Sequence, residues 1–162
     1  MPNQQDHSLS REELHKELDL IQEVVKRMAQ NSFQVKTWLI GVLMAMLAFT
    51  KDEVFGSADS TAGLALNGML FLPIAFFWYL DGFFLRTERL YRNVYKWVIQ
   101  YRPITNAYLY DLNTFKREVK GKETIIEIPS TWKVMISQTL LFFYLIPLLF
   151  VAALMTYNLW QL

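Results

Sequence analysis

The residue types that could carry out chemistry in this chain are few, and their spacing favours no reaction. Glu12 and His15 have the Glu-x-x-His spacing of half a di-iron site, but a helical-bundle site of that kind needs two such motifs and further glutamates. The six glycines form neither of the common nucleotide-binding loops. The lack of cysteine excludes thiolate catalysis, disulfides and Cys-ligated metals. We therefore expect a protein that is not an enzyme, with no catalytic residues, no metal site and no cofactor.

Asp81 is the carboxylate that most needs a partner. It is the only ionisable residue of Leu64–Leu85, a run long and apolar enough to cross the ~30 Å hydrocarbon of a bilayer. An ionised carboxylate in that position is costly unless it is paired or hydrated. Arg86 points about 140° away around the same helix, whereas Lys36 enters an earlier apolar run at comparable depth. We predict a Lys36–Asp81 ion pair that joins two spans; the alternative is a carboxylate that reaches the lipid headgroups.

Four basic residues follow Asp81 at helical spacing. Beside a membrane, such a stripe attracts anionic lipid headgroups, at about 1 kcal/mol per charge, and it could also bind an acidic soluble partner. The alternative is charge that only fixes the topology, with Glu88 and Arg92 paired at i,i+4. Nucleic acid is not an expected partner. The basic stripe consists of Arg86, Arg89, Arg92 and Lys96.

Polar residues that could line a pore are scarce in the apolar runs. A narrow selective channel needs a ring of polar or charged groups from every subunit. Asp81, or the cluster of Asn31, Ser32 and Gln34, could supply such a ring.

Three apolar blocks must position these side chains, and each block is a candidate membrane span. Hydrophobic residues make up 53% of the chain and are concentrated in these blocks. In the block Thr131–Trp160, Trp132 and Trp160 lie about 42 Å apart along a helix, which matches the two headgroup belts. The block Val35–Thr50 rises only about 24 Å, slightly less than the hydrocarbon thickness. An interfacial helix is therefore the alternative there.

The distribution of charge favours three crossings. Residues 86–133 hold ten Lys and Arg, whereas residues 51–62 hold one Lys and three acids. Basic residues concentrate on the cytoplasmic side of membrane proteins. We therefore predict a multi-pass membrane protein, with the N-terminus cytoplasmic and the C-terminus external. The N-terminal residues have no apolar run behind a basic start, so we expect no cleaved secretory signal.

A long helix is predicted before the first apolar block. Ser10 and Glu13 have the spacing of a capping box. From Leu14 to Leu39, apolar residues, with Ser32 at one position, recur in alternating steps of four and three, the repeat of a helix that supercoils against partners. The pattern predicts either a coiled coil between copies of the chain or one amphipathic helix that packs on its own chain.

The predicted fold is an all-α membrane protein with three transmembrane helices, long cytosolic helical extensions and a small soluble insert. We expect the second long helix to end at Arg102-Pro103. In the insert, a turn at Lys120–Lys122 and a β-like run after it favour either a small hairpin or a helix with an edge strand. The predicted segments are a cytosolic amphipathic helix (1–34), a transmembrane helix (35–50), an external loop (51–62), a second transmembrane helix (63–85), a cytosolic basic helix extension (86–102), a cytosolic insert (103–130) and a third transmembrane helix (131–160).

Three stretches of the sequence carry a signature. Asn31–Trp38, Phe77–Arg92 and Ser137–Tyr144 together resemble the pattern NSFxxKxW, FWxLDxxxLRxERLxRxxY and SxTLxxFY of small bacterial multi-span membrane proteins. The resemblance covers about residues 28–100 and 132–150, whereas residues 104–129 depart from the pattern. It implies as motif positions Lys36, Trp38, Asp81, Arg86, Glu88 and Arg89.

The organisation of the chain is also similar to that of membrane effectors of prokaryotic defence systems. These include the SLATT-type two-span effectors and the CRISPR-accessory pore protein of one class of RNA-guided RNA nuclease. By this analogy we expect an oligomeric inner-membrane protein that perturbs or permeabilises the membrane in antiviral defence. Its expected partners are membrane lipids with anionic headgroups, further copies of itself and a soluble defence-system protein. The alternative is a membrane-anchored scaffold or regulator that docks a soluble partner through its basic cytosolic face.

Overall fold

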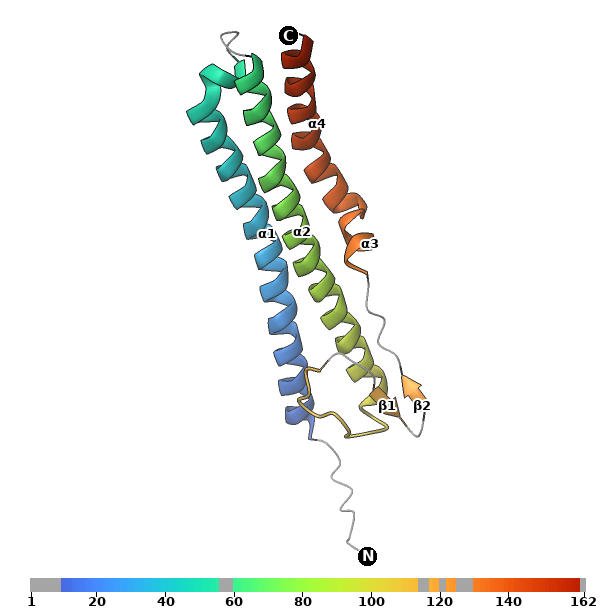
Figure 1. Cartoon of the computed structure of the whole chain (residues 1–162). Coiled ribbons are helices and arrows are strands. Elements are labelled where there is room, and N and C mark those ends of the chain that lie inside the picture. The colour runs from blue at the N-terminus through green and yellow to red at the C-terminus, as the bar shows by residue number, and fades with distance from the viewer. Residues whose placement is uncertain (1–9, 56–59, 114–116, 120–121, 125–129, 161–162) are drawn as a thin grey trace, which may run out of the picture. The chain divides into compact units, whose positions relative to one another are not determined.

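The computed structural model describes residues 10–55, 60–113, 117–119, 122–124 and 130–160, and its fold is all-α with one short two-stranded sheet (Figure 1). This confirms the predicted fold class. The described elements are α1 (Arg11–Phe55), α2 (Ser60–Tyr101), β1 (Arg117–Val119), β2 (Lys122–Thr124), α3 (Thr131–Met135) and α4 (Gln138–Trp160).

Three of the described helices are long and apolar enough to cross a membrane, as the sequence predicts. The candidate spans lie within Arg11–Phe49, Leu64–Tyr101 and Gln138–Trp160, and the last has the highest mean hydropathy, 2.3. By length and composition, the chain therefore has the architecture of a multi-pass membrane protein.

The loop between the first two long helices is shorter than predicted. Helix α1 continues to Phe55 and α2 begins at Ser60, so most of the predicted loop at 51–62 is helical and only residues 56–59 lie outside the described part. Residues 51–55 contain neither Gly nor Pro, and extending an existing helix adds one hydrogen bond for each residue fixed. The chain therefore stays helical up to Phe55.

The third apolar block is two helices instead of the single helix predicted at 131–160. Helix α3 ends at Met135, and α4 begins at Gln138 after a break at Ile136 and Ser137. The Ser137 carbonyl accepts hydrogen bonds from the backbone N–H groups of Leu140 and Leu141. Serine is a favoured residue just before a helix, which accounts for the new start there.

The chain divides into two compact units, and each is described by itself. The terminal unit comprises Met1–Met28 and Thr87–Pro129, and the apolar unit comprises Ala29–Arg86 and Ser130–Leu162. Helices α1 and α2 each contribute residues to both units.

In the terminal unit, the heptad face of α1 packs on α2 of the same chain. Ile21 is buried with Val94, Trp97 and Val98, and Leu14, Leu18 and several tyrosines surround this cluster. Of the two interpretations of the heptad, packing within the chain is therefore the one observed. The predicted capping box is confirmed: the Glu13 N–H donates to Ser10 Oγ at 3.2 Å, and the Ser10 N–H donates to Glu13 Oε2 at 2.9 Å.

The insert contains the predicted hairpin. Strands β1 and β2 pair antiparallel, with Arg117 opposite Thr124. The predicted turn falls largely on residues 120–121, which lie outside the described residues. Helix α2 ends at Tyr101, as expected from the Arg102-Pro103 step.

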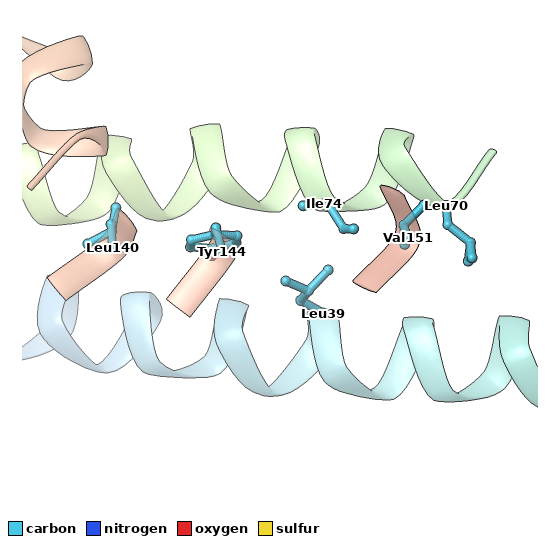
Figure 2. Packing of buried hydrophobic residues seen from close by; sticks show 6 residues of the cluster. All are labelled: Leu39, Leu70, Ile74, Leu140, Tyr144 and Val151. Carbon is cyan, nitrogen blue, oxygen red and sulfur yellow. The ribbon is translucent and has the colours of Figure 1, made fainter. Parts of the chain in front are cut away.

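In the apolar unit, α1, α2 and α4 contribute to one core. Figure 2 shows six of its buried residues, with Leu39 from α1, Leu70 and Ile74 from α2, and the remaining three from α4. Those three are Leu140, Tyr144 and Val151.

Helix α3 packs closely against α2 at Gly82. The Trp78 Nε1–H donates to the Met135 carbonyl at 3.1 Å, and a Cβ added at Gly82 would lie 2.5 Å from Met135 Cγ. Gly82→Ala is therefore expected to destabilise the fold by about 1–3 kcal/mol through overpacking. Thermal unfolding in detergent measures this.

Gly68→Ala is the matched control on the same helix. A Cβ at Gly68 meets nothing within 4 Å. This variant should be neutral or more stable by up to about 1 kcal/mol, since alanine favours helix more than glycine does. Equal unfolding temperatures for both variants would show that α3 does not need close contact with Gly82.

Candidate functional site

The candidate site is a polar network in the apolar unit that joins three helices. Ser32 and Lys36 lie one turn apart on α1, so their side chains share one face. Asp81 comes from α2 and Tyr144 from α4. Asp81 and Tyr144 are fully buried, and the side chain of Lys36 is 20% exposed.

The other three side chains surround the Asp81 carboxylate with donors. Lys36 Nζ lies 2.5 Å from Asp81 Oδ2, and it also donates to Ser32 Oγ at 2.9 Å. Ser32 Oγ donates to Asp81 Oδ1 at 2.5 Å. The Tyr144 hydroxyl lies 3.0 Å from Asp81 Oδ2 and 3.1 Å from the Phe77 carbonyl oxygen, and it has one proton to donate to either acceptor.

The predicted Lys36–Asp81 ion pair is therefore present in the structure. A buried carboxylate is tolerated when it is paired and its remaining lone pairs accept hydrogen bonds. Here both conditions are met by residues from α1 and α4. The network holds the first span to the second, as predicted, and also holds the third.

Tyr144 is a further member of the network, beyond the residues predicted from the sequence. Its ring stacks on Trp78 with an interplanar angle of 9°, and it meets the Phe143 ring edge-on. Buried tyrosines usually place the hydroxyl on a polar partner. A tyrosine inside an apolar run therefore indicates a buried polar contact. The apolar sequence around Tyr144 does not indicate which helix the hydroxyl faces.

The predicted pore-lining residues do not gather on one face. Ser32 is buried and its hydroxyl is engaged in the network, Asn31 is half-buried, and Gln34 is exposed. In the structure, the Ser32 hydroxyl on α1 donates a hydrogen bond to the Asp81 carboxylate on α2. A pore-lining role for Asn31 and Gln34 stays a prediction.

The basic stripe is partly exposed. Arg92 pairs with the buried Glu88 at 2.6 Å, which confirms the predicted i,i+4 pair, and 63% of the Arg92 side chain remains exposed. Lys96 is exposed, whereas Arg86 and Arg89 are half-buried. Arg92 and Lys96 are thus the stripe residues most open to a ligand.

A second buried ion pair lies in the terminal unit. Arg102 binds the Glu17 carboxylate with two guanidinium nitrogens, one of them Nε at 2.8 Å, and both side chains are almost wholly buried. Arg102 Nη1 also donates to the carbonyl oxygens of Thr105 and Ala107 at 3.2 and 2.9 Å. This pair fixes the loop after α2 to the start of α1.

Arg117, the first residue of β1, is buried beside the same loop. Its guanidinium lies 4.5 Å from the Trp97 ring centroid, and Nη2 donates to the Asp111 carbonyl at 2.6 Å. Burial lowers the pKa of Arg117, and the Asp111 charge opposes this shift. Because the ordinary value is so high, the guanidinium stays charged at physiological pH.

The described residues include no group of three or more His, Asp or Glu side chains that could hold a metal ion. Glu12 and His15 are both exposed on α1. The fold and the network together define a multi-pass helical protein whose apolar helices are joined by a buried ion pair. Comparison with protein-family models, curated proteins and solved structures found no match.

Proposed function

We propose that this chain is a non-enzymatic, oligomeric protein of the bacterial inner membrane that perturbs or permeabilises the membrane, as an effector of defence against phages. The observation that supports this best is the buried network of Ser32, Lys36, Asp81 and Tyr144, which ties three candidate spans together through one charge pair.

The network suits a latch on the membrane unit. While Lys36 and Asp81 are paired, the apolar unit exposes no unpaired charge from this site to lipid. A signal that separates them would leave charge in the hydrocarbon, which is relieved by local thinning of the bilayer and by entry of water. Opening of the latch therefore supplies a route to membrane leakage without any catalytic step.

The orientation follows from charge. The basic residues of 86–133 favour the cytoplasm, which with three crossings supports a cytoplasmic N-terminus and an external C-terminus. In this orientation the exposed Arg92 and Lys96 are available to anionic headgroups or to an activating partner.

Because the heptad face of α1 is already packed on α2, the proposed self-association uses the spans. Thr37, Gly41 and Ala45 follow in steps of four on α1, and all three are exposed in the single chain. Small residues at this spacing let helices approach closely in lipid. A Cβ at Gly41 meets nothing within 4 Å, so a larger side chain there disturbs contacts between chains without disturbing the fold.

The test combines mass and leakage. In mild detergent we expect the wild-type complex to have a multiple of the 19.1 kDa chain mass, and Gly41→Leu to shift it toward a single chain. Val42→Leu, on an adjacent face of the same helix, should leave the mass unchanged. Expression of the wild type should depolarise cells, whereas Gly41→Leu should not. A wild-type monomer that causes no leak of a potential-sensitive dye contradicts the proposal.

A second candidate function is a membrane-anchored scaffold or regulator. The packing of the α1 heptad within the chain favours it, since that feature no longer requires self-association. The exposed charges of Arg92 and Lys96 suit an acidic soluble partner. A stoichiometric soluble protein purified with the chain from native membranes, lost in Arg92→Glu/Lys96→Glu and accompanied by no conductance, would favour this second function.

A further inference from the structure

The apolar unit contains two buried amides that the ion-pair network does not use. Asn67 on α2 is fully buried, and Asn158 on α4 is 4% exposed. Within the part of the chain that the structure describes, neither polar atom of the Asn67 side chain has a hydrogen-bond partner, and neither does Nδ2 of Asn158. An amide buried without a partner in an apolar medium costs several kcal/mol.

Both asparagines lie toward the same end of the seam between α2 and α4. Residues 67 and 70 are three apart on one helix and residues 151 and 158 are seven apart on the other, so each asparagine shares a face with a core residue. Those core residues, Leu70 and Val151, belong to one buried cluster (Figure 2). The amides therefore face the same seam as the core.

The two helices run antiparallel along this seam. In Figure 2, Leu70 and Val151 lie at the same end of the buried cluster, whereas Tyr144, which bonds Asp81 further along α2, lies toward the other end. Asn67 is thus displaced about 4.5 Å from the Leu70–Val151 level, and Asn158 about 10.5 Å in the same direction. The offset of about 6 Å exceeds a direct hydrogen bond but is within reach of one or two bridging waters.

We propose that Asn67 and Asn158 hold bound water between α2 and α4. A polar seam with at least three unmatched amide atoms supplies the two to four partners that a buried water requires. The ligand class is water rather than a cation, because neither amide carries the negative charge of a usual cation site. This inference does not depend on the proposed function.

The sign of a stability change tests the proposal. If the amides are hydrated, Asn67→Leu leaves the bound water and the Asn158 amide without hydrogen-bond partners. The unfolding midpoint in detergent should then fall by about 2–8 °C. If Asn67 is dry, the same variant removes an unsatisfied group and the midpoint should rise. A rise would overturn the proposal.

The double variant separates loss of hydration from a poor fit of leucine. Asn67→Leu/Asn158→Leu removes both amides and leaves a dry seam, so it should recover most of the loss caused by Asn67→Leu. A double variant that is no better than the single variant would assign the loss to packing and overturn the proposal. Thr156→Val is the control, because this exposed hydroxyl donates to the Ala153 carbonyl of its own helix at 2.8 Å, and no drop is expected.

Discussion

Lys36→Met is expected to destabilise the protein by about 3–5 kcal/mol, because it leaves the fully buried Asp81 carboxylate without its countercharge. Ser32 and Tyr144 still donate to Asp81, but two neutral donors do not replace an ammonium group. Thermal unfolding in detergent and the folded fraction by size-exclusion chromatography measure the loss.

Asp81→Asn should be milder than Lys36→Met. The Lys36 side chain is 20% exposed, so its ammonium can turn toward the headgroups once its partner is neutral. The double variant Lys36→Met/Asp81→Asn should be more stable than Lys36→Met alone, which makes a double-mutant cycle informative. Lys133→Met is the control for losing an exposed lysine in the same unit. If Lys36→Met were no worse than Lys133→Met, the ion pair would contribute nothing to the fold.

The same variants report on the proposed latch. A latch predicts that Asp81→Asn protein inserted in the membrane depolarises cells at a lower expression level than the wild type. A purely structural ion pair predicts less protein in the membrane and less leakage. Leakage divided by the amount of folded protein therefore rises for a latch and stays unchanged for a purely structural ion pair.

Arg102→Leu is the second substitution with a large expected effect. It leaves Glu17 buried without a countercharge and removes the donors to the Thr105 and Ala107 carbonyls, for an expected loss of about 3–5 kcal/mol in the terminal unit. Arg102→Lys should recover little, since an ammonium group cannot reproduce the two-nitrogen contact with Glu17. Hydrogen exchange of residues 103–113 measures the loss locally.

Arg92→Leu is the matched control for Arg102→Leu. It also takes an arginine from a buried carboxylate, Glu88, but both residues lie on α2, so the loss falls on that helix, whereas the Arg102 guanidinium also donates to loop carbonyls. Faster exchange of residues 103–113 is therefore expected for Arg102→Leu and not for Arg92→Leu. Similar exchange in both variants would mean that the loop is held by other contacts.

Several features could be predicted because they depend on local sequence. The capping box at Ser10 and Glu13, the apolar runs and the Glu88–Arg92 pair each involve residues within a few helical turns. The Lys36–Asp81 pair was also predictable over 45 positions, because very few lysines could reach the depth of the one carboxylate in its span.

Other features depend on which surfaces meet in three dimensions. Glu17 and Arg102 are 85 positions apart, and each has several alternative partners nearby in the sequence. The burial of Arg117 against Trp97 likewise cannot be predicted from the short β-like sequence around Arg117. The helix break at Ile136 has no Gly or Pro nearby that would predict it, and Ser137 alone only weakly indicates a new helix start.

The Tyr144 hydroxyl determines which polar attachment between the three helices is lost first. Its proton has a second acceptor, the Phe77 carbonyl on α2, whereas Ser32 and Lys36 reach α2 in this network only through the Asp81 carboxylate. When that carboxylate is neutralised or turned aside, the tyrosine can still hold α4 beside α2, but the polar attachment of α1 is lost. Within the apolar unit, the α1 part is thus the one that loses its polar attachment first, while α2 and α4 stay joined.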